Sequence, residues 1–305
     1  MSDLLMRPPG YEVARACLNA QSDRPQRSAV QRFLGIDPMH PDAVSWFQGT
    51  LGEIRVGEVL AKLGPEWTVV HSVPIGTRGS DIDHIVVGPA GAFTINTKRH
   101  RGKKVWVGER RILVSGQKTD HLRNARYEAE RASAILSRAL GEVVPVSAVL
   151  VIVESAGITT RSQPDDVTVL TDGELLRWLK RRKPTLDSDD VARLSRIATD
   201  SRTWGAAVAA DVDLGVMTAF EALRREDSSA HRIRLTWIAL AAAVLLGVGG
   251  FLLAGAVESG LSDPLYVAEL GREERYFCVP LHQSLNESQK ELGGRLVEPD
   301  ATPSA

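Results

Sequence analysis

An acidic residue and a lysine lie on two neighbouring predicted strands. These strands, residues 82–87 and 92–98, are rich in branched apolar side chains and flank a Gly-Pro-Ala-Gly sequence that is typical of a tight turn. If those four residues form the turn, counting back along the strands places Asp83 opposite Asn96. Because side chains alternate along a strand, Asp83, Asn96 and Lys98 then share one face of the sheet.

Two interpretations fit this set of side chains. A carboxylate, an amide oxygen and a lysine could hold a divalent metal and a water beside a phosphodiester, and the alternative is a partly solvated cross-strand ion pair worth less than about 1 kcal/mol. The upstream run G-T-L-G-E-I-R-V-G-E, residues 49–58, favours the first, because it opens a helical pattern that carries a further acid, Glu53. Glu58 lies five residues further on, about 140° round the helix, and is interpreted as a solvated charge.

Four motifs in this order resemble the nuclease-related domain family, NERD, a relative of the PD-(D/E)XK nucleases. They are G-T-L-G-E, W-T-V-V-H-S-V-P, D-I-D-H-I-V-V-G-P and F-T-I-N-T-K, and the resemblance covers roughly residues 47–180. It implies an α/β fold with a restriction-endonuclease-like core, in which helices flank a central mixed sheet. The expected order is a helix, a three-stranded meander, a second helix and a further strand. The resemblance also implies Glu53 as the helix acid, Asp83 as the metal-binding acid and Lys98 as the catalytic lysine.

One position departs from the family pattern. Many members have Glu two residues before the lysine, whereas this chain has Asn96. An amide oxygen can ligate Mg²⁺, but it brings no negative charge, and hard cations favour carboxylates. With Asp83, Asn96 and Glu53 as ligands, the expected cofactor is one Mg²⁺ or Mn²⁺, which would polarise a phosphoryl oxygen and lower the pKa of a bound water. Lys98 would orient that water or stabilise charge on the phosphate.

Two functions follow from this pattern. The first is a metal-dependent hydrolase that cuts DNA or RNA. The second is a catalytically degenerate module that binds nucleic acid or a protein at the membrane without cutting, which the amide at Asn96 favours. A purely structural membrane protein would leave the order of the motifs without an explanation.

A basic run follows the second strand directly. The sequence K-R-H-R-G-K-K occupies residues 98–104 of a chain whose formal net charge is only −1. Such a local cluster indicates contact with phosphates, and the alternative is a solvated loop. His84 and His100 are weaker candidates for acid–base roles. The predicted nucleic-acid contacts are Arg99, His100, Arg101, Lys103 and Lys104.

The elements around the hairpin are expected to act as its scaffold. A first strand is predicted at 67–73, a hairpin at 105–114, a helix at 120–140, a buried strand at 143–153 and short helices after Thr171 and at 189–198. The long helix has an apolar stripe and ends before Gly141, a suitable C-cap. Gln117 and Asn124 are candidates for an assisting role near the site, the alternative being a surface role. The faces of this helix other than the apolar stripe are expected to carry Arg123, Asn124, Arg126, Glu128 and Arg131.

A membrane span is predicted near the C-terminal end of the sequence. Residues 235–257 run without a charge and would form a helix of about 35 Å, enough to cross a hydrocarbon core. A buried helix of a soluble protein is the alternative, but this stretch is apolar on every face. Arginines precede it and acidic residues follow it, so the positive-inside rule predicts a single-pass protein of the cell membrane with a cytoplasmic N-terminal domain.

The sequence therefore divides into five predicted segments. Residues 1–40 form a partly ordered extension, 41–200 the NERD-like domain, 201–234 a connector, 235–257 the span and 258–305 a short extracytoplasmic tail. The two cysteines, Cys17 and Cys278, fall on opposite sides of the span, which argues against a disulfide within the chain. No cysteine metal motif and no phosphate-cradling glycine loop is present, so zinc-finger and P-loop functions are not indicated.

Overall fold

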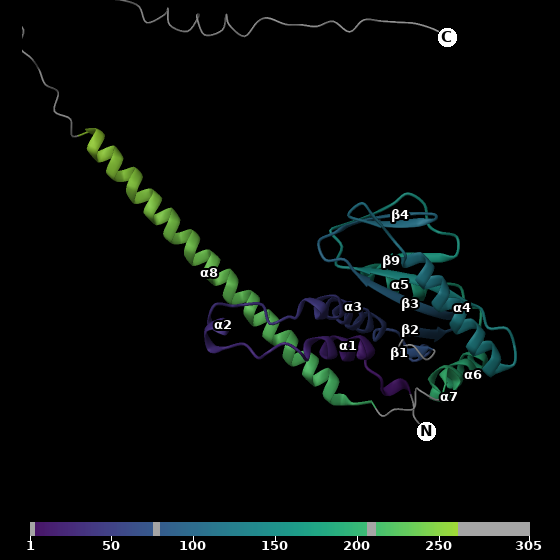
Figure 1. Cartoon of the computed structure of the whole chain (residues 1–305). Coiled ribbons are helices and arrows are strands. Elements are labelled where there is room, and N and C mark those ends of the chain that lie inside the picture. The colour runs from purple at the N-terminus through teal and green to yellow at the C-terminus, as the bar shows by residue number, and fades with distance from the viewer. Residues whose placement is uncertain (1–3, 76–79, 206–211, 262–305) are drawn as a thin grey trace, which may run out of the picture. The chain divides into compact units, whose positions relative to one another are not determined.

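A five-stranded mixed sheet forms the centre of the first of two units into which the chain divides (Figure 1). The computed structural model describes residues 4–75, 80–205 and 212–261, and the units are residues 1–244 and 245–305. The strand order is β1-β2-β3-β7-β9, in which β1, β2 and β3 form the predicted antiparallel meander and β7 and β9 continue parallel to β3. The strands are β1 (Thr68–Ile75), β2 (Ser80–Gly88), β3 (Gly91–Arg99), β7 (Val146–Val153) and β9 (Val167–Thr171).

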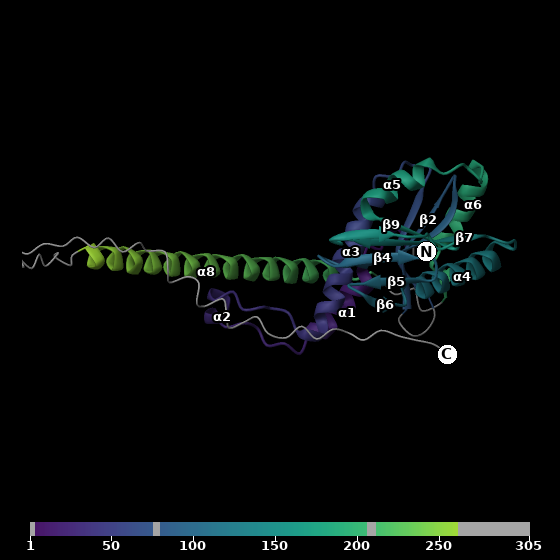
Figure 2. The same cartoon turned by 90° about the horizontal axis from the view of Figure 1, so that it is seen from above.

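Helices cover both faces of this sheet, as Figure 2 also shows. Alternate residues of β7 pack on opposite sides: Val149 and Val151 lie against α3 (Val44–Leu60) and α5 (Asp172–Arg181), whereas Leu150 and Ile152 lie on the side of α4 (His121–Leu140). α6 (Ser188–Thr199) packs on the same side as α4. This double burial explains why β7 reads as a continuous apolar run. The restriction-endonuclease-like α/β core is confirmed.

The predicted ends of two helices are confirmed. Gly141 closes α4 in the left-handed conformation, with φ of 83°, and its N–H bonds to the carbonyl of Ser137. Thr171 and Glu174 form the expected capping box at the start of α5. These local signals fixed where the helices begin and end.

A second, four-stranded sheet has the order β6-β5-β4-β8. It contains the predicted hairpin, formed by β4 (Lys104–Gly108) and β5 (Arg111–Val114), together with β6 (Gln117–Thr119) and β8 (Gly157–Thr160). The apolar side chains of β4 and β5 pack against the N-terminal half of α4. The basic run 98–104 therefore connects the two sheets.

The N-terminal residues pack against the start of the last helix. Residues 1–40, expected as a partly ordered extension, contain η1 (Leu4–Met6), α1 (Tyr11–Gln21) and α2 (Ala29–Phe33), and η2 (Pro41–Ala43) leads into α3. In the expected connector, α7 (Ser201–Trp204) precedes α8 (Leu214–Leu261). Phe47 of α3 contacts Phe220 of α8 with ring centroids 5.3 Å apart. α1, η2, α3 and the first turns of α8 thus share one apolar cluster.

Within the part of the chain that the structure describes, α8 is the one helix long and apolar enough to cross a membrane. The candidate span there is Gly215–Val248, and its apolar window is not buried inside the molecule. The charge-free run 235–257 is helical throughout. The predicted tail beyond residue 261 lies outside the described residues.

Candidate active site

The site lies where β2 and β3 part. The ladder between these strands has the predicted register and runs from the turn to the pair His84 and Ile95. β2 stays paired with β1 as far as Ser80, and β3 continues along β7 as far as Arg99. The residues that follow the last β2–β3 pair, Asp83 and Asn96, therefore stand at a fork in the sheet.

The side chain of Asp83 bridges this fork. Its Oδ2 accepts a hydrogen bond from the backbone N–H of Thr97 at 2.6 Å, and the carboxylate is buried. Burial raises the pKa of Asp83, while the positive charge of Lys98 and the N–H of Thr97 oppose that rise. The ammonium of Lys98 donates to the carbonyl of Thr97 at 3.0 Å. Asp83 and the lysine thus meet at the fork, as the strand alternation predicts.

Glu128 of α4 is the site residue that the sequence analysis misassigned. Its Oε1 accepts a hydrogen bond from Nδ2 of Asn96 at 2.5 Å. Burial, followed by the charge of Asp83, raises the pKa of Glu128 to about 8. The interpretation of Glu128 as part of an outer helix face is wrong. It lies three residues after Ala125 and four before Ala132, both buried, and this spacing is the signal that could have found it.

Glu53 reaches the fork from α3, on the opposite side of the sheet from α4. It is buried, and burial together with the charges of Asp83 and Asp81 raises its pKa well above the usual range. The neighbouring Gly52 allows this approach, because a Cβ there would lie 3.1 Å from Cβ of Arg99. The helix that carries Glu53 therefore faces the hairpin.

A fourth carboxylate, Asp81, completes the acidic group. Burial, Asp83 and Glu12 raise the pKa of Asp81 to about 7. Among the described residues, Glu53, Asp81, Asn96 and Glu128 each have one buried side-chain oxygen without a hydrogen-bond partner.

These carboxylate and amide oxygens lie close together, and few positive charges balance them. Hard divalent cations bind preferentially to oxygen ligands of this kind. However, no three His, Cys, Asp or Glu side chains in the described residues already form a metal-binding group.

A cavity of about 630 Å³ opens beside the acidic group. Glu53 and Asp83 contribute its acidic lining, and the exposed Trp46 of α3 contributes an aromatic ring. The cavity combines acids, cations and an aromatic surface within one concave space. Its basic lining consists of Lys98, Arg99, His100, Arg101 and Lys103.

The basic run is divided between buried and exposed side chains. The guanidinium of Arg99 is only 6% exposed and pairs with Glu154 at 2.6 Å, so it is held by the protein itself. Arg101 is 73% exposed, and Lys103 and Lys104 are also exposed. The cations open to solvent are therefore those of the loop and the start of β4.

The histidines near the site form two pairs. Nε2 of His100 lies 3.0 Å from Nε2 of His121 in a stacked arrangement, and burial lowers the pKa of His121 to about 4. Nδ1 of His84 lies 2.8 Å from Nδ1 of His71, and complete burial lowers the pKa of His84 well below its usual value. His84 is consequently a neutral interior residue, whereas His100 lines the cavity.

The fold and the site together define a mixed α/β protein with acids and a lysine gathered at a fork in its sheet. Residues 48–153, about a third of the chain, match the family model described as nuclease-related domain, NERD. The matched region begins in α3 and ends with β7, and it contains Glu53, Asp83, Asn96, Lys98 and Glu128. Neither a curated protein nor a solved structure matches the chain.

Proposed function

We propose that this protein is a membrane-anchored, metal-dependent nuclease that hydrolyses phosphodiesters of DNA or RNA. The observation that carries the proposal is the fork at the end of the β2–β3 ladder, where Asp83, Glu53 and Glu128 interact with one another and with Lys98. Perturbed carboxylates beside a lysine in a cavity are typical of catalytic sites. The nuclease-related domain supports the same reaction class.

Glu128 supplies the charge that Asn96 lacks. In this proposal Asp83, Asn96 and Glu128, with Glu53, hold one Mg²⁺ or Mn²⁺ through carboxylate and amide oxygens. The bound ion would polarise the phosphoryl oxygen and acidify a water. Lys98 stabilises the charge that develops on the phosphate, because its ammonium lines the same cavity as Asp83.

The nucleic acid lies along the cavity in this proposal. Arg101, Lys103 and Lys104 contact phosphates, since their side chains are exposed, and His100 lies in the lining between them and Lys98. The predicted contact at Arg99 would require it to leave Glu154. The exposed ring of Trp46 offers a stacking surface for a base of a single strand.

α8 anchors the domain in the cell membrane in a single pass. The arginines before residue 235 support a cytoplasmic N-terminal domain in this proposal, through the positive-inside rule. Nucleic acid and Mg²⁺ are both present in that compartment.

One observation favours the alternative of a binding module without catalysis. No three His, Cys, Asp or Glu side chains among the described residues are preassembled around a metal position. Such a module would keep the basic surface and bind nucleic acid in a salt-dependent way, without any need for a divalent ion.

The test uses the full chain in lipid nanodiscs with labelled single-stranded DNA, duplex DNA and RNA. Cleavage is compared in Mn²⁺, Mg²⁺ and EDTA for the wild type, Asp83→Asn, Lys98→Ala and Glu128→Gln, with Glu130→Gln as the control because Glu130 is exposed on the same helix. We expect metal-dependent cleavage that all three site variants abolish and the control retains. Salt-sensitive binding without cleavage would establish the binding module, and neither activity would refute both functions.

A further inference from the structure

The segment between α1 and α3 forms an arm that is held along α8 immediately before the apolar span. Ile36 and Gly35 follow α2, and Gly35 adopts the left-handed conformation with φ of 68°. A Cβ at Gly35 would lie 2.7 Å from the carbonyl oxygen of Ala230 and 2.8 Å from the backbone nitrogen of Arg234. Only glycine allows the arm to approach α8 this closely.

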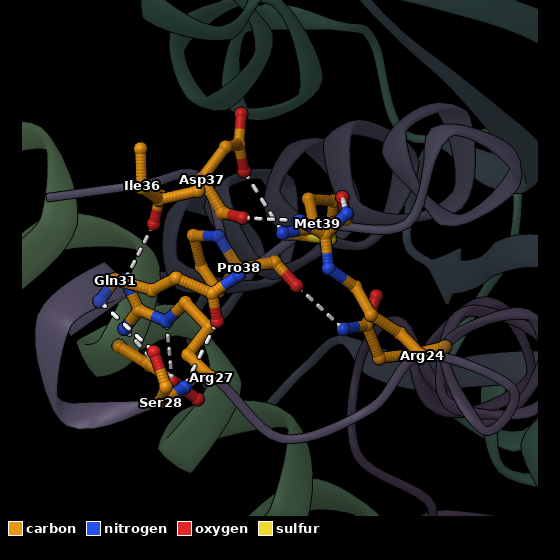
Figure 3. A network of polar contacts seen from close by, with 10 residues as sticks. Arg24, Arg27, Ser28, Gln31, Ile36, Asp37, Pro38 and Met39 are labelled. Carbon is orange, nitrogen blue, oxygen red and sulfur yellow. Dashed lines mark hydrogen bonds and ion pairs between the residues drawn. The ribbon is translucent and has the colours of Figure 1, made fainter.

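Polar contacts fix the shape of the arm (Figure 3). Arg24 donates to the carbonyl oxygens of Asp37 and Met39, and Arg27 donates to that of Ile36, so the two guanidinium groups bridge the outgoing and returning halves. Ser28 and Gln31 form a capping box that starts α2. The arm is thus a closed, hydrogen-bonded unit.

Two further contacts attach the arm to α8. Arg27 is buried and binds Glu226, with Nη2 to Oε1 at 2.8 Å. The indole N–H of Trp237 donates to the carbonyl oxygen of Phe33 at 2.9 Å, and the two rings meet edge to face with centroids 5.1 Å apart. The tip of the arm therefore lies level with the first turn of the charge-free run, which begins at residue 235.

The tip presents apolar side chains to solvent although its backbone is well held. Val30 is 66% exposed and Phe33 63%, and Leu34 and Ile36 are exposed as well. Val30, Phe33 and Leu34 follow the i, i+3, i+4 spacing of one helix face. A rigid apolar face of this kind, continuous with the exposed side chains at the start of a candidate span, is typical of a surface that meets a membrane.

Charges behind the tip fit the headgroup region. Arg32 of α2 and Arg225 and Arg232 of α8 are exposed, and a cavity of about 790 Å³ between the arm and α8 is lined by Arg24, Arg32 and Arg225 among others. Trp237 has the amphipathic ring that favours the boundary between water and hydrocarbon. The arm and the start of the span thus present apolar groups, an aromatic ring and arginines. The hydrocarbon, the interface and the anionic headgroups of a bilayer would meet these three kinds of group.

We propose that the arm, residues 24–39, inserts its apolar tip into the interface of the bilayer that α8 crosses, with its arginines on anionic lipid headgroups. The arm would then fix the orientation of the N-terminal domain at the membrane, because one helix alone leaves the domain free to rotate. This inference rests on the proposed membrane anchoring by α8, and it is independent of nuclease activity.

Photo-crosslinking of the full chain tests the arm. Benzoylphenylalanine replaces Val30 or Phe33 in protein reconstituted into nanodiscs of phosphatidylglycerol and phosphatidylcholine, and adducts are identified by mass spectrometry. Leu240→benzoylphenylalanine reports insertion of α8, and Tyr127→benzoylphenylalanine is the matched control, since Tyr127 is an exposed aromatic residue of α4. We expect lipid adducts at positions 30, 33 and 240 and none at 127.

The outcomes separate the two ideas. Lipid adducts at 240 without any at 30 and 33 would refute insertion of the arm while α8 still spans the membrane. Absence of lipid adducts at 240 would refute the anchor itself. Protein–protein adducts at 30 and 33 would show that a second copy covers the tip, and would also overturn the proposal. Because both substituted side chains are exposed, the change is compatible with the fold.

Discussion

Replacing Glu128 by Gln should make the metal-free protein more resistant to denaturation at pH 8. The amide keeps an oxygen that can accept the hydrogen bond from Asn96, but it removes a charge from a buried acidic group. The pKa of Glu128 is raised from 4.5 to about 8. A carboxyl with a raised pKa in the folded state stabilises the protein fully below its unfolded pKa, and loses that contribution as pH rises through the folded pKa. Glu128 therefore destabilises the protein progressively between about pH 4.5 and pH 8.

The magnitude follows from the same two values. Each pKa unit corresponds to about 1.4 kcal/mol, so a rise of about 3.5 gives a ceiling of about 5 kcal/mol. Glu128 is partly accessible to solvent, which screens its charge, and about 2 kcal/mol is the expected gain for Glu128→Gln at pH 8. Well below pH 4.5, the variant and the wild type should be about equally stable, because the wild-type carboxyl is then protonated in both the folded and the unfolded state.

Guanidinium denaturation in detergent micelles with EDTA, followed by tryptophan fluorescence, measures the effect. The free energy of unfolding is compared at pH 5 and pH 8 for the wild type, Glu128→Gln and Glu130→Gln. Glu130 is exposed on the same helix, so its variant should keep the wild-type pH dependence. If Glu128→Gln loses as much stability between pH 5 and pH 8 as the wild type does, the ionised carboxylate of Glu128 does not destabilise the fold, and the reasoning is wrong.

Four other predictions concern the acidic group and the basic run. Glu128→Gln should weaken Mn²⁺ binding in isothermal titration, because it removes a charge from the ligand set, and Asn96→Glu should strengthen it, because it adds one. The double variant, which exchanges acid and amide between β3 and α4, should bind about as tightly as the wild type, and unchanged binding in Glu128→Gln would separate Glu128 from the ligand set. Mn²⁺ should raise the melting temperature more at pH 8 than at pH 5, because the acids of the site bind protons at the lower pH, and an equal rise would place the ion elsewhere. Arg99→Ala should cost about 1.5–3 kcal/mol of stability, since it removes the buried side chain of Arg99 and its charged hydrogen bond to the half-exposed Glu154. Lys103→Ala should instead weaken nucleic-acid binding at low salt and leave the stability unchanged. If Arg99→Ala weakened binding and Lys103→Ala lowered stability, the structural role given to Arg99 and the binding role given to Lys103 would be wrong.

Local sequence signals determined the strands, the turn and the ends of the helices. Branched residues on either side of Gly-Pro-Ala-Gly predict the β2–β3 hairpin and its register, because the loop length fixes which residues face each other. The capping box at Thr171 and the glycine at position 141 mark helix ends through interactions within a few residues. The charge-free run 235–257 predicts a candidate span from composition alone.

Only the tertiary structure decided which acids meet at the fork. Glu128 lies 32 residues from Asn96 along the chain, and the packing of α4 under the sheet brings their side chains to 2.5 Å. Likewise, Arg99 looks like part of an exposed basic run until Glu154, across the sheet on the segment after β7, pairs with its guanidinium. A spacing pattern records neighbours along one element, whereas burial and charge depend on the elements that pack across it. For that reason the sequence by itself was enough to place Asp83, Asn96 and Lys98 on one face of the sheet. Only the fold decided that Glu53 and Glu128 approach the fork from opposite sides of that sheet.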